Sequence, residues 1–289
     1  MTRRKPTDNS NKISRGDPPN FLGQHFMHAK KLIREIVDQA RISRSDTVLE
    51  LGAGKGALTE ALAQKAGKVL AVEYDRRLIE SLQQKIAPYG NIKIIRQDIL
   101  KLHLPKENFV VVSNIPYSIT TPIMKMLLNH PNSGFQRGVL IMEQGAAKRF
   151  TAKTVKDPYV AAWRMWFDFC YVKTVQRQCF SPPPKVDSAM LFITRKAKPL
   201  VPAKDGFLFH GLAEHMLRAP KSTIDASVHG ILTPPQVKYL KRSLNLKEAI
   251  SVESLTEAQW GIIFDTMVKH VPRFRWPKAR NKARSKKKS

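Results

Sequence analysis

The chain has 289 residues, 42% of them hydrophobic, and a formal net charge of +27. This length predicts one large domain, or one domain beside a smaller one, and the hydrophobic content excludes a wholly disordered chain. Its two cysteines, Cys170 and Cys179, exclude a disulfide framework and indicate a reduced, cytoplasmic protein. We expect neither a signal peptide nor a membrane span, because the N-terminus is polar and no apolar run reaches the roughly 20 residues that cross a bilayer.

The positive charge is spread along the chain. Residues 1–16 carry +4 of it and residues 273–289 carry +9, so +14 remains for the residues between them. A folded part that is basic in its own right predicts a polyanionic partner, of which nucleic acid is the commonest. The alternative is a surface that keeps the protein soluble or attracts it to a membrane. The sign, size and spread of the charge together favour nucleic acid.

Hydrophobic periodicity divides the first 150 residues into alternating strands and helices. Residues 1–17 lack such a pattern and are expected to form a flexible basic arm. The spacing of apolar residues predicts a first helix over residues 28–41. Strands are predicted at 47–51, 69–73, 92–95, 109–113 and 138–142, and further helices at 57–67, 76–87, 120–129 and 143–150. This alternation predicts an α/β fold with a doubly wound, Rossmann-like and mostly parallel sheet.

The pattern changes after residue 150. Residues 151–158 are predicted to be an exposed loop, and the segments 159–172 and 189–195 are expected to add two strands. From about residue 203 the strands stop, and helices are predicted at 205–218, 234–244 and 256–271. We therefore divide the chain into a basic arm at 1–17, an α/β domain at 18–200, a smaller helical domain at 201–272 and a basic tail at 273–289.

A glycine-rich loop follows the first predicted strand of the sheet. Gly52, Gly54 and Gly56 form the pattern G-x-G-x-G, and glycines there let the backbone turn sharply and approach a ligand closely. Glu73 ends the next strand, where a carboxylate can accept hydrogen bonds from ribose hydroxyls. Asp98 follows the third strand and can accept from an adenine amino group. Taken singly, Glu73 could be a solvated strand end and Asp98 a helix cap.

This ordered set resembles the class I methyltransferases that use S-adenosylmethionine. The resemblance implies a Rossmann-like methyltransferase domain and a cofactor bound by Gly52, Gly54, Glu73 and Asp98. A nicotinamide-dependent dehydrogenase is the competing interpretation. Its dinucleotide fingerprint is G-x-G-x-x-G, which this loop does not match. We expect no bound metal.

The tetrapeptide Asn114-Ile115-Pro116-Tyr117 follows the fourth predicted strand. An adenine amino group is a poor nucleophile because its lone pair is delocalised into the ring. Acceptors such as the Asn114 side-chain oxygen and the Ile115 carbonyl can engage its hydrogens and favour a tetrahedral nitrogen. Pro116 stiffens the turn, and Tyr117 offers a face for a base turned out of its stack. The alternative is a turn with an incidental tyrosine.

The tetrapeptide resembles the [DNS]-P-P-[YFW] signature of amino methyltransferases, in the form found in the rRNA adenine N6 dimethyltransferases. Residues 20–26 resemble the segment with which that family closes over its cofactor, which implies that Asn20, Leu22 and Asn114 contact the cofactor. Residues 180–188 resemble its F-x-P-P-P-K-V-x-S segment, which implies that Phe180 is a second aromatic wall against the target base. The alternative is that Phe180 belongs to the core. Pro19 stands where the family usually has glutamine.

Within that family, residues 19–25, 142–150 and 162–167 and the long basic tail most resemble the erythromycin-resistance (Erm) methyltransferases. That resemblance implies mono- or dimethylation of one adenine in 23S rRNA and resistance to macrolides, lincosamides and streptogramin B. Two alternatives stay open. One is the related housekeeping enzyme that dimethylates adenines of small-subunit (16S) rRNA, and the other is a non-enzymatic nucleic-acid-binding protein with the same fold.

Lysines and arginines are expected to attract the RNA phosphates without reading sequence. Candidates are the basic arm, Lys148, Arg149 and Lys153 near the catalytic face, Arg164, and the basic tail. The site itself should be selected by RNA shape and by a base that can be turned out. The helical domain could clamp the RNA or only cover the sheet. We expect the protein to act as a monomer.

Overall fold

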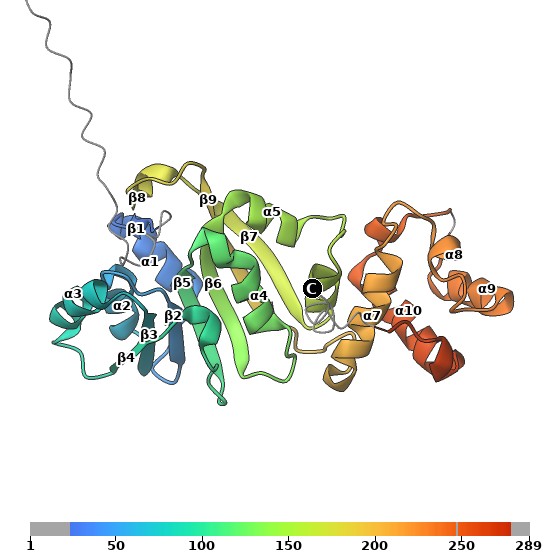
Figure 1. The fold of residues 1–289 in the computed structure, drawn as a ribbon, viewed down its shortest axis with the longest axis horizontal. Coiled ribbons are helices and arrows are strands. Elements are labelled where there is room, and N and C mark those ends of the chain that lie inside the picture. The colour runs from blue at the N-terminus through green and yellow to red at the C-terminus, as the bar shows by residue number, and fades with distance from the viewer. Residues whose placement is uncertain (1–23, 247, 279–289) are drawn as a thin grey trace, which may run out of the picture.

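The computed structural model describes residues 24–246 and 248–278. Within them, a seven-stranded sheet with the order β4-β3-β2-β5-β6-β9-β7 forms the centre of the molecule (Figure 1). The strands are β2 (Thr47–Leu51), β3 (Lys68–Glu73), β4 (Ile92–Arg96), β5 (Phe109–Asn114), β6 (Phe135–Glu143), β7 (Phe167–Val175) and β9 (Ser188–Arg195). β2 to β6 run parallel, and β9 is antiparallel to both of its neighbours. The predicted α/β fold with a mostly parallel sheet is thereby confirmed.

Helices cover both faces of this sheet. On one face lie α1 (Lys30–Gln39), α2 (Ala57–Ala63) and α3 (Arg76–Ile86), and on the other lies α4 (Thr120–Leu128). The alternation of side chains along β5 explains the division. Val110 belongs to the same hydrophobic cluster as Ile36 of α1, whereas Val111 belongs to the cluster that contains Ile123 of α4. A buried parallel strand must bury apolar residues on both sides, which is why residues 109–112 are continuously hydrophobic.

The segment after β6 differs from the predicted strand at 159–172. After α5 (Gln144–Thr151), a short helix, α6 (Pro158–Trp163), precedes the strand β7. The Asp157 carboxylate accepts a hydrogen bond from the Tyr159 amide, and Pro158 occupies the first turn, so local capping begins a helix.

Two-residue strands β1 (Phe26–Met27) and β8 (Phe180–Ser181) pair with each other, which the sequence pattern did not indicate.

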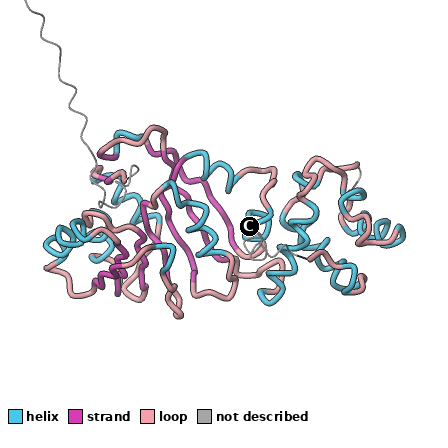
Figure 2. Tube along the Cα trace, in the orientation of Figure 1, coloured by secondary structure: helices cyan, strands magenta, loops and turns pink. Residues whose placement is uncertain are grey.

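Four α-helices follow the sheet within the described residues: α7 (Gly206–Met216), α8 (Ile224–Ser227), α9 (Pro234–Ser243) and α10 (Glu257–His270). They lie beyond β7, at the opposite end of the molecule from β4 (Figures 1 and 2). The Phe209 ring of α7 contacts both Trp166, just before β7, and Trp260 of α10. The hydrophobic core therefore continues from the sheet into these helices. With one turn, α8 is too short to show a helical repeat in the sequence.

Short 3-10 helices complete the described structure: η1 (Ile99–Lys101), η2 (Tyr117–Ile119), η3 (Arg177–Cys179), η4 (Ala203–Asp205), η5 (Val252–Ser254) and η6 (Arg273–Arg275). No helix among residues 24–246 and 248–278 is long and apolar enough to cross a membrane. The predicted arm at 1–17 and most of the predicted tail lie outside the described residues.

Candidate active site

The glycine loop between β2 and α2 has the left-handed backbone that its composition predicts. Gly52, Gly54 and Gly56 have φ angles of +81°, +56° and +77°, which residues with a side chain rarely adopt. A Cβ atom on Gly54 would lie 3.2 Å from the Phe26 ring, and one on Gly56 would lie 2.5 Å from Leu82 Cδ1. Glycine is therefore required in this loop for two reasons: the backbone is left-handed, and neighbouring side chains leave little room for a Cβ atom.

Glu73 fixes this loop from the end of β3. Its Oε2 accepts a hydrogen bond of 2.8 Å from the Gly54 amide, and its Oε1 accepts from the amides of Tyr74 and Asp75 at 2.8 and 3.0 Å. The residue is only 6% exposed, and these bonds provide its buried oxygens with partners. A carboxylate has about four acceptor positions, so Glu73 retains capacity for a ligand hydroxyl.

Asp98 follows β4 and caps the short helix η1. Its Oδ1 accepts a hydrogen bond of 2.9 Å from the Leu100 amide, as the helix-cap interpretation predicts. The side chain is nevertheless part of the wall of the same cavity as Glu73. A cap uses one oxygen of the carboxylate, so capping and ligand binding are compatible at this position.

The tetrapeptide begins at the end of β5 and continues into η2. The Asn114 side-chain amide donates a 2.8 Å hydrogen bond to the carbonyl of His25, 89 residues away in the chain. Its Oδ1 is buried and accepts no hydrogen bond within the described residues. Such an orphaned buried acceptor costs about 1–3 kcal/mol, so its presence indicates a missing donor. Ile115 is 1% exposed, and its amide donates to Ile141 at 3.1 Å, which fixes the backbone that follows.

Tyr117 lies between two segments that are distant in sequence. Its hydroxyl is hydrogen-bonded to the hydroxyl of Ser188 at the start of β9, and its ring lies 5.7 Å from the His25 ring, centroid to centroid. Burial, together with the charge of Glu143, raises the pKa of Tyr117, although the Ser188 hydrogen bond opposes the shift. The hydroxyl therefore stays neutral at physiological pH, which makes Tyr117 a neutral aromatic surface and not a base.

These residues line one cavity of about 1160 Å³ at the carboxyl ends of the parallel strands. Its volume exceeds the roughly 300–1,000 Å³ of a typical small-molecule site, so it has room for more than one small molecule. Open α/β sheets bind ligands at this edge. The residues predicted for the site that line it are Gly52, Gly54, Glu73, Asp98, Asn114, Ile115, Pro116 and Tyr117.

Three predicted site residues are not found in the cavity wall. Phe180 is 2% exposed and packs in the core with Val175 and Met190, as its alternative interpretation predicts. Its strand β8 pairs with β1 through the Met27–Phe180 register. Asn20 and Leu22 lie outside the described residues.

Glu50 and His25 line the cavity but were absent from the predicted site. Glu50 is 2% exposed, and the Thr59 hydroxyl donates a 2.6 Å hydrogen bond to it. Burial raises the pKa of Glu50 to about 8, an effect that the Thr59 bond opposes and the nearby Glu73 charge increases. The sequence did offer a sign that Glu50 belongs to the site, because it is a carboxyl group within a mostly apolar strand. For His25 the sequence offers no such sign, because this residue reaches Asn114 and Tyr117 only through long-range contacts.

The basic candidates differ in exposure. Lys148 and Arg149 of α5 and Lys153 beyond it are exposed. Arg164 is not available to RNA, which corrects its prediction as a phosphate contact. It is 9% exposed and donates hydrogen bonds of 2.7 and 2.8 Å to the carbonyls of Phe150 and Ala152. Its guanidinium therefore fixes the end of α5. Among the described residues, no group of His, Cys, Asp and Glu could hold a metal ion.

Comparison with known proteins agrees with this geometry. The family model for ribosomal RNA adenine dimethylases matches residues 19–269. An rRNA adenine N-6-methyltransferase of Bacillus licheniformis is 59% identical over 268 residues, 93% of each chain. A ribosomal RNA small subunit methyltransferase A of Bacillus thuringiensis (strain Al Hakam) is 37% identical over 202 residues, 65% of this chain and 68% of the relative.

Among solved structures, the 23S rRNA methyltransferase ErmE superposes with a TM-score of 0.75 at 27% identity, over 84% of this chain and 100% of that one. The methyltransferase fold, the methyl donor and the Erm resemblance predicted from the sequence are confirmed by these matches. The chain therefore belongs to the ribosomal RNA adenine dimethylase family, as an Erm-type rRNA adenine N6-methyltransferase that uses S-adenosylmethionine.

Proposed function

We propose that the substrate of this enzyme is one adenine of 23S rRNA and that its methylation confers resistance to macrolides, lincosamides and streptogramin B. The observation that carries the choice is the likeness to ErmE, named a 23S rRNA methyltransferase, which extends over 100% of that chain. Small-subunit methyltransferases match with lower identity: the Bacillus thuringiensis enzyme is 37% identical over 65% of this chain and that of Geobacillus is 35% identical over 77% of it, against 59% over 93% for the Bacillus licheniformis rRNA adenine N-6-methyltransferase. The segments at 142–150 and 162–167, which resemble the Erm family, support the same assignment.

The glycine loop, Glu73 and Asp98 are proposed to hold the cofactor. A loop that excludes side chains, a carboxylate with spare acceptor capacity and a second carboxylate on the same wall fit a nucleoside with ribose hydroxyls and an amino group. S-adenosylmethionine supplies an electrophilic methyl group when bound. Asn20 and Leu22 stay predicted contacts from the segment before β1.

The tetrapeptide is proposed to hold the target base. The orphaned Oδ1 of Asn114 accepts a hydrogen bond from the adenine amino group, and the Ile115 carbonyl accepts the second. Two acceptors draw electron density toward the nitrogen and orient its lone pair for an in-line attack. The methylated nitrogen then loses a proton, for which no strong base is required. Asn114 is also proposed to contact the cofactor, because it lines the same cavity as Glu73 and Asp98.

Tyr117 is proposed to stack against the adenine once it leaves its helix. Its hydroxyl bond to Ser188 and its contact with His25 restrict the orientation of the ring. The proposed role of Phe180 as a second wall requires its ring to leave the core beside β1. We further propose that the protein acts on RNA as a monomer.

Methyl transfer to naked ribosomal RNA tests the target. The enzyme is incubated with labelled S-adenosylmethionine and purified large-subunit or small-subunit rRNA, and the methylated base is mapped by primer extension. We expect one site in 23S rRNA. A small-subunit target, which the 37% identical relative favours, would appear as label confined to 16S rRNA and would overturn the proposal. Expression in a susceptible bacterium should raise the inhibitory concentrations of a macrolide and a lincosamide together.

A further inference from the structure

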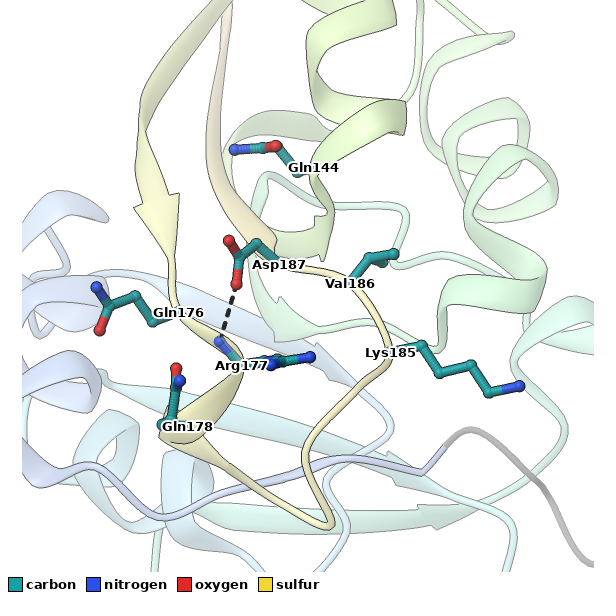
Figure 3. Close-up of a pocket in the computed structure, with 7 residues that line it drawn as sticks. All are labelled: Gln144, Gln176, Arg177, Gln178, Lys185, Val186 and Asp187. Carbon is teal, nitrogen blue, oxygen red and sulfur yellow. Dashed lines mark hydrogen bonds between the residues drawn. The ribbon is translucent and has the colours of Figure 1, made fainter.

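We propose that a second, smaller hollow beside the tetrapeptide binds a nucleotide next to the target adenine in the RNA. The hollow has a volume of about 500 Å³ and lies between η3 and the loop before β9 (Figure 3). It is lined by Gln144, Gln176, Arg177, Gln178, Lys185, Val186 and Asp187. The inference rests on the proposed position of the target adenine at Tyr117.

The wall of the hollow includes Asp187, the residue next to Ser188, whose hydroxyl anchors Tyr117. Ser188, whose hydroxyl bonds to Tyr117, pairs with Glu143 in the ladder between β6 and β9. The next residues along the two segments are Asp187 and Gln144, and the Gln144 amide donates to the Asp187 carbonyl at 3.1 Å. Both residues line the hollow. RNA whose adenine lies at Tyr117 therefore has its neighbouring nucleotides within reach of this surface.

Gln144, in the wall of the hollow, has a side-chain amide of fixed orientation. Its Nε2 donates hydrogen bonds to the hydroxyls of Tyr171 at 3.1 Å and Thr174 at 2.9 Å, which uses both amide hydrogens. Among the described residues, no hydrogen bond reaches its Oε1. Gln176 and Gln178, from the other side of the hollow, are exposed, and their carboxamides form no hydrogen bond within the described part of the chain.

The chemistry of this lining fits a nucleotide with an accessible base. Carboxamides both donate and accept, as base edges do, and unpaired bases in RNA are recognised through such edges. Val186 is 48% exposed and offers an apolar surface to a ring face. Arg177 and Lys185 add two positive charges for phosphate. The single carboxylate, on Asp187, already accepts a hydrogen bond of 3.2 Å from the Arg177 backbone amide (Figure 3).

A double substitution of the two exposed glutamines tests the base contact. Gln176→Ala with Gln178→Ala is compared with Gln83→Ala and Gln84→Ala, a glutamine pair that is also exposed, on α3 beside β3 and β4. The substrates are short RNA hairpins around the mapped adenine, in which the nucleotides directly before and after it are varied to all four bases. The readout is kcat/KM for each hairpin, together with the cofactor Kd.

We expect the wild-type enzyme and the α3 variant to prefer one neighbouring base by about tenfold, within the range of a specific base contact. The Gln176/Gln178 variant should lose most of this preference, with cofactor affinity unchanged. An unchanged preference in that variant, or none in the wild type, would overturn the subsite. Failure of the wild type to methylate any RNA would instead refute the proposed function, and the subsite with it.

The two cations provide an independent readout. Arg177→Ala with Lys185→Ala should raise KM for all hairpins alike and reduce the salt dependence of RNA binding, since phosphate contacts carry no sequence information. The neighbour preference should persist in this variant. If the cation variant changed the preference and the glutamine variant did not, the hollow would not read a base through its amides.

Discussion

The two sides of the large cavity are constructed differently. On the cofactor side, Glu73 accepts three backbone hydrogen bonds and Asp98 accepts one, each from a residue at most 19 positions away in the chain. On the side of the tetrapeptide, Asn114 bonds to His25 across 89 positions and Tyr117 bonds to Ser188 across 71. The cofactor side is thus formed by local structure, whereas the acceptor side depends on three separate segments of the chain.

The two sides also differ in what they leave unpaired. The Asn114 Oδ1 is buried and has no hydrogen-bond partner within the described residues, although its Nδ2 donates to the His25 carbonyl. The folded protein therefore retains an unfavourable interaction that a bound amino group would relieve. Substitutions on the cofactor side should change binding of the methyl donor, and substitutions on the acceptor side should change turnover.

The largest effect is expected for Asn114→Ala. Loss of one preorganised group at the reacting atom typically lowers kcat by about 100-fold to 1,000-fold. Because the proposed base contact is made by Oδ1, cofactor affinity should change by only about threefold, a small fraction of that loss. Steady-state methylation of RNA and calorimetric titration of the cofactor measure the two quantities. A parallel loss of both would mean that Asn114 mainly contacts the cofactor.

A smaller loss is expected for Tyr117→Ala. Stacking of a base on an aromatic ring contributes about 1–3 kcal/mol, so methylation should fall by roughly 5-fold to 150-fold while cofactor binding is retained. Tyr117→Phe serves as the control, because it keeps the ring and removes only the hydroxyl bond to Ser188. If the phenylalanine variant were as defective as the alanine variant, the hydroxyl and not the ring face would be the important feature.

These differences also explain how far the sequence predicts the site. The glycine loop, Glu73 and Asp98 follow strands whose apolar runs are clear, so their placement at one edge of a parallel sheet could be predicted. The tetrapeptide could be placed for the same reason. The contacts that fix Asn114 and Tyr117 could not, because His25 and Ser188 reach them only through tertiary structure.

Beyond residue 150 the prediction was less complete. The helix α6 was expected to be a strand, since Tyr159, Val160 and Trp163 are also typical of strands. The capping by Asp157 decided the local structure. Arg164 was expected to contact RNA, but burial against the end of α5 cannot be read from a lone arginine. Burial of Phe180 likewise depends on the pairing of β1 with β8.

On the cofactor side, Glu73→Gln should weaken the binding of S-adenosylmethionine by about tenfold. The neutral side chain keeps the size of the carboxylate but loses hydrogen bonds to a charged acceptor, each of which contributes about 1.5–3 kcal/mol. At saturating cofactor, kcat should be close to that of the wild type. A large loss of kcat with unchanged cofactor affinity would contradict the division between the two sides.

The smallest effect on turnover is expected for Glu50→Gln. This substitution should instead change how the free energy of unfolding depends on pH. Burial raises the pKa of Glu50 from 4.5 to about 8, so between these values the folded state holds a proton that the unfolded state releases. The stability contributed by this group is complete below about pH 4.5 and is lost as the pH rises through 8, by up to ~1.4 kcal/mol per pH unit. Glutamine keeps the neutral form and can still accept the Thr59 hydrogen bond.

The free energy of unfolding of Glu50→Gln relative to the wild type should therefore increase between pH 5 and pH 8 and level off above it. Urea denaturation at a series of pH values measures this difference. Thr59→Val is a useful companion, because loss of the hydroxyl should raise the pKa of Glu50 further and extend the pH-dependent loss of stability to higher pH at the same slope. If the difference did not vary with pH, Glu50 would be ionised in the folded protein, as a buried carboxylate that accepts the Thr59 hydrogen bond.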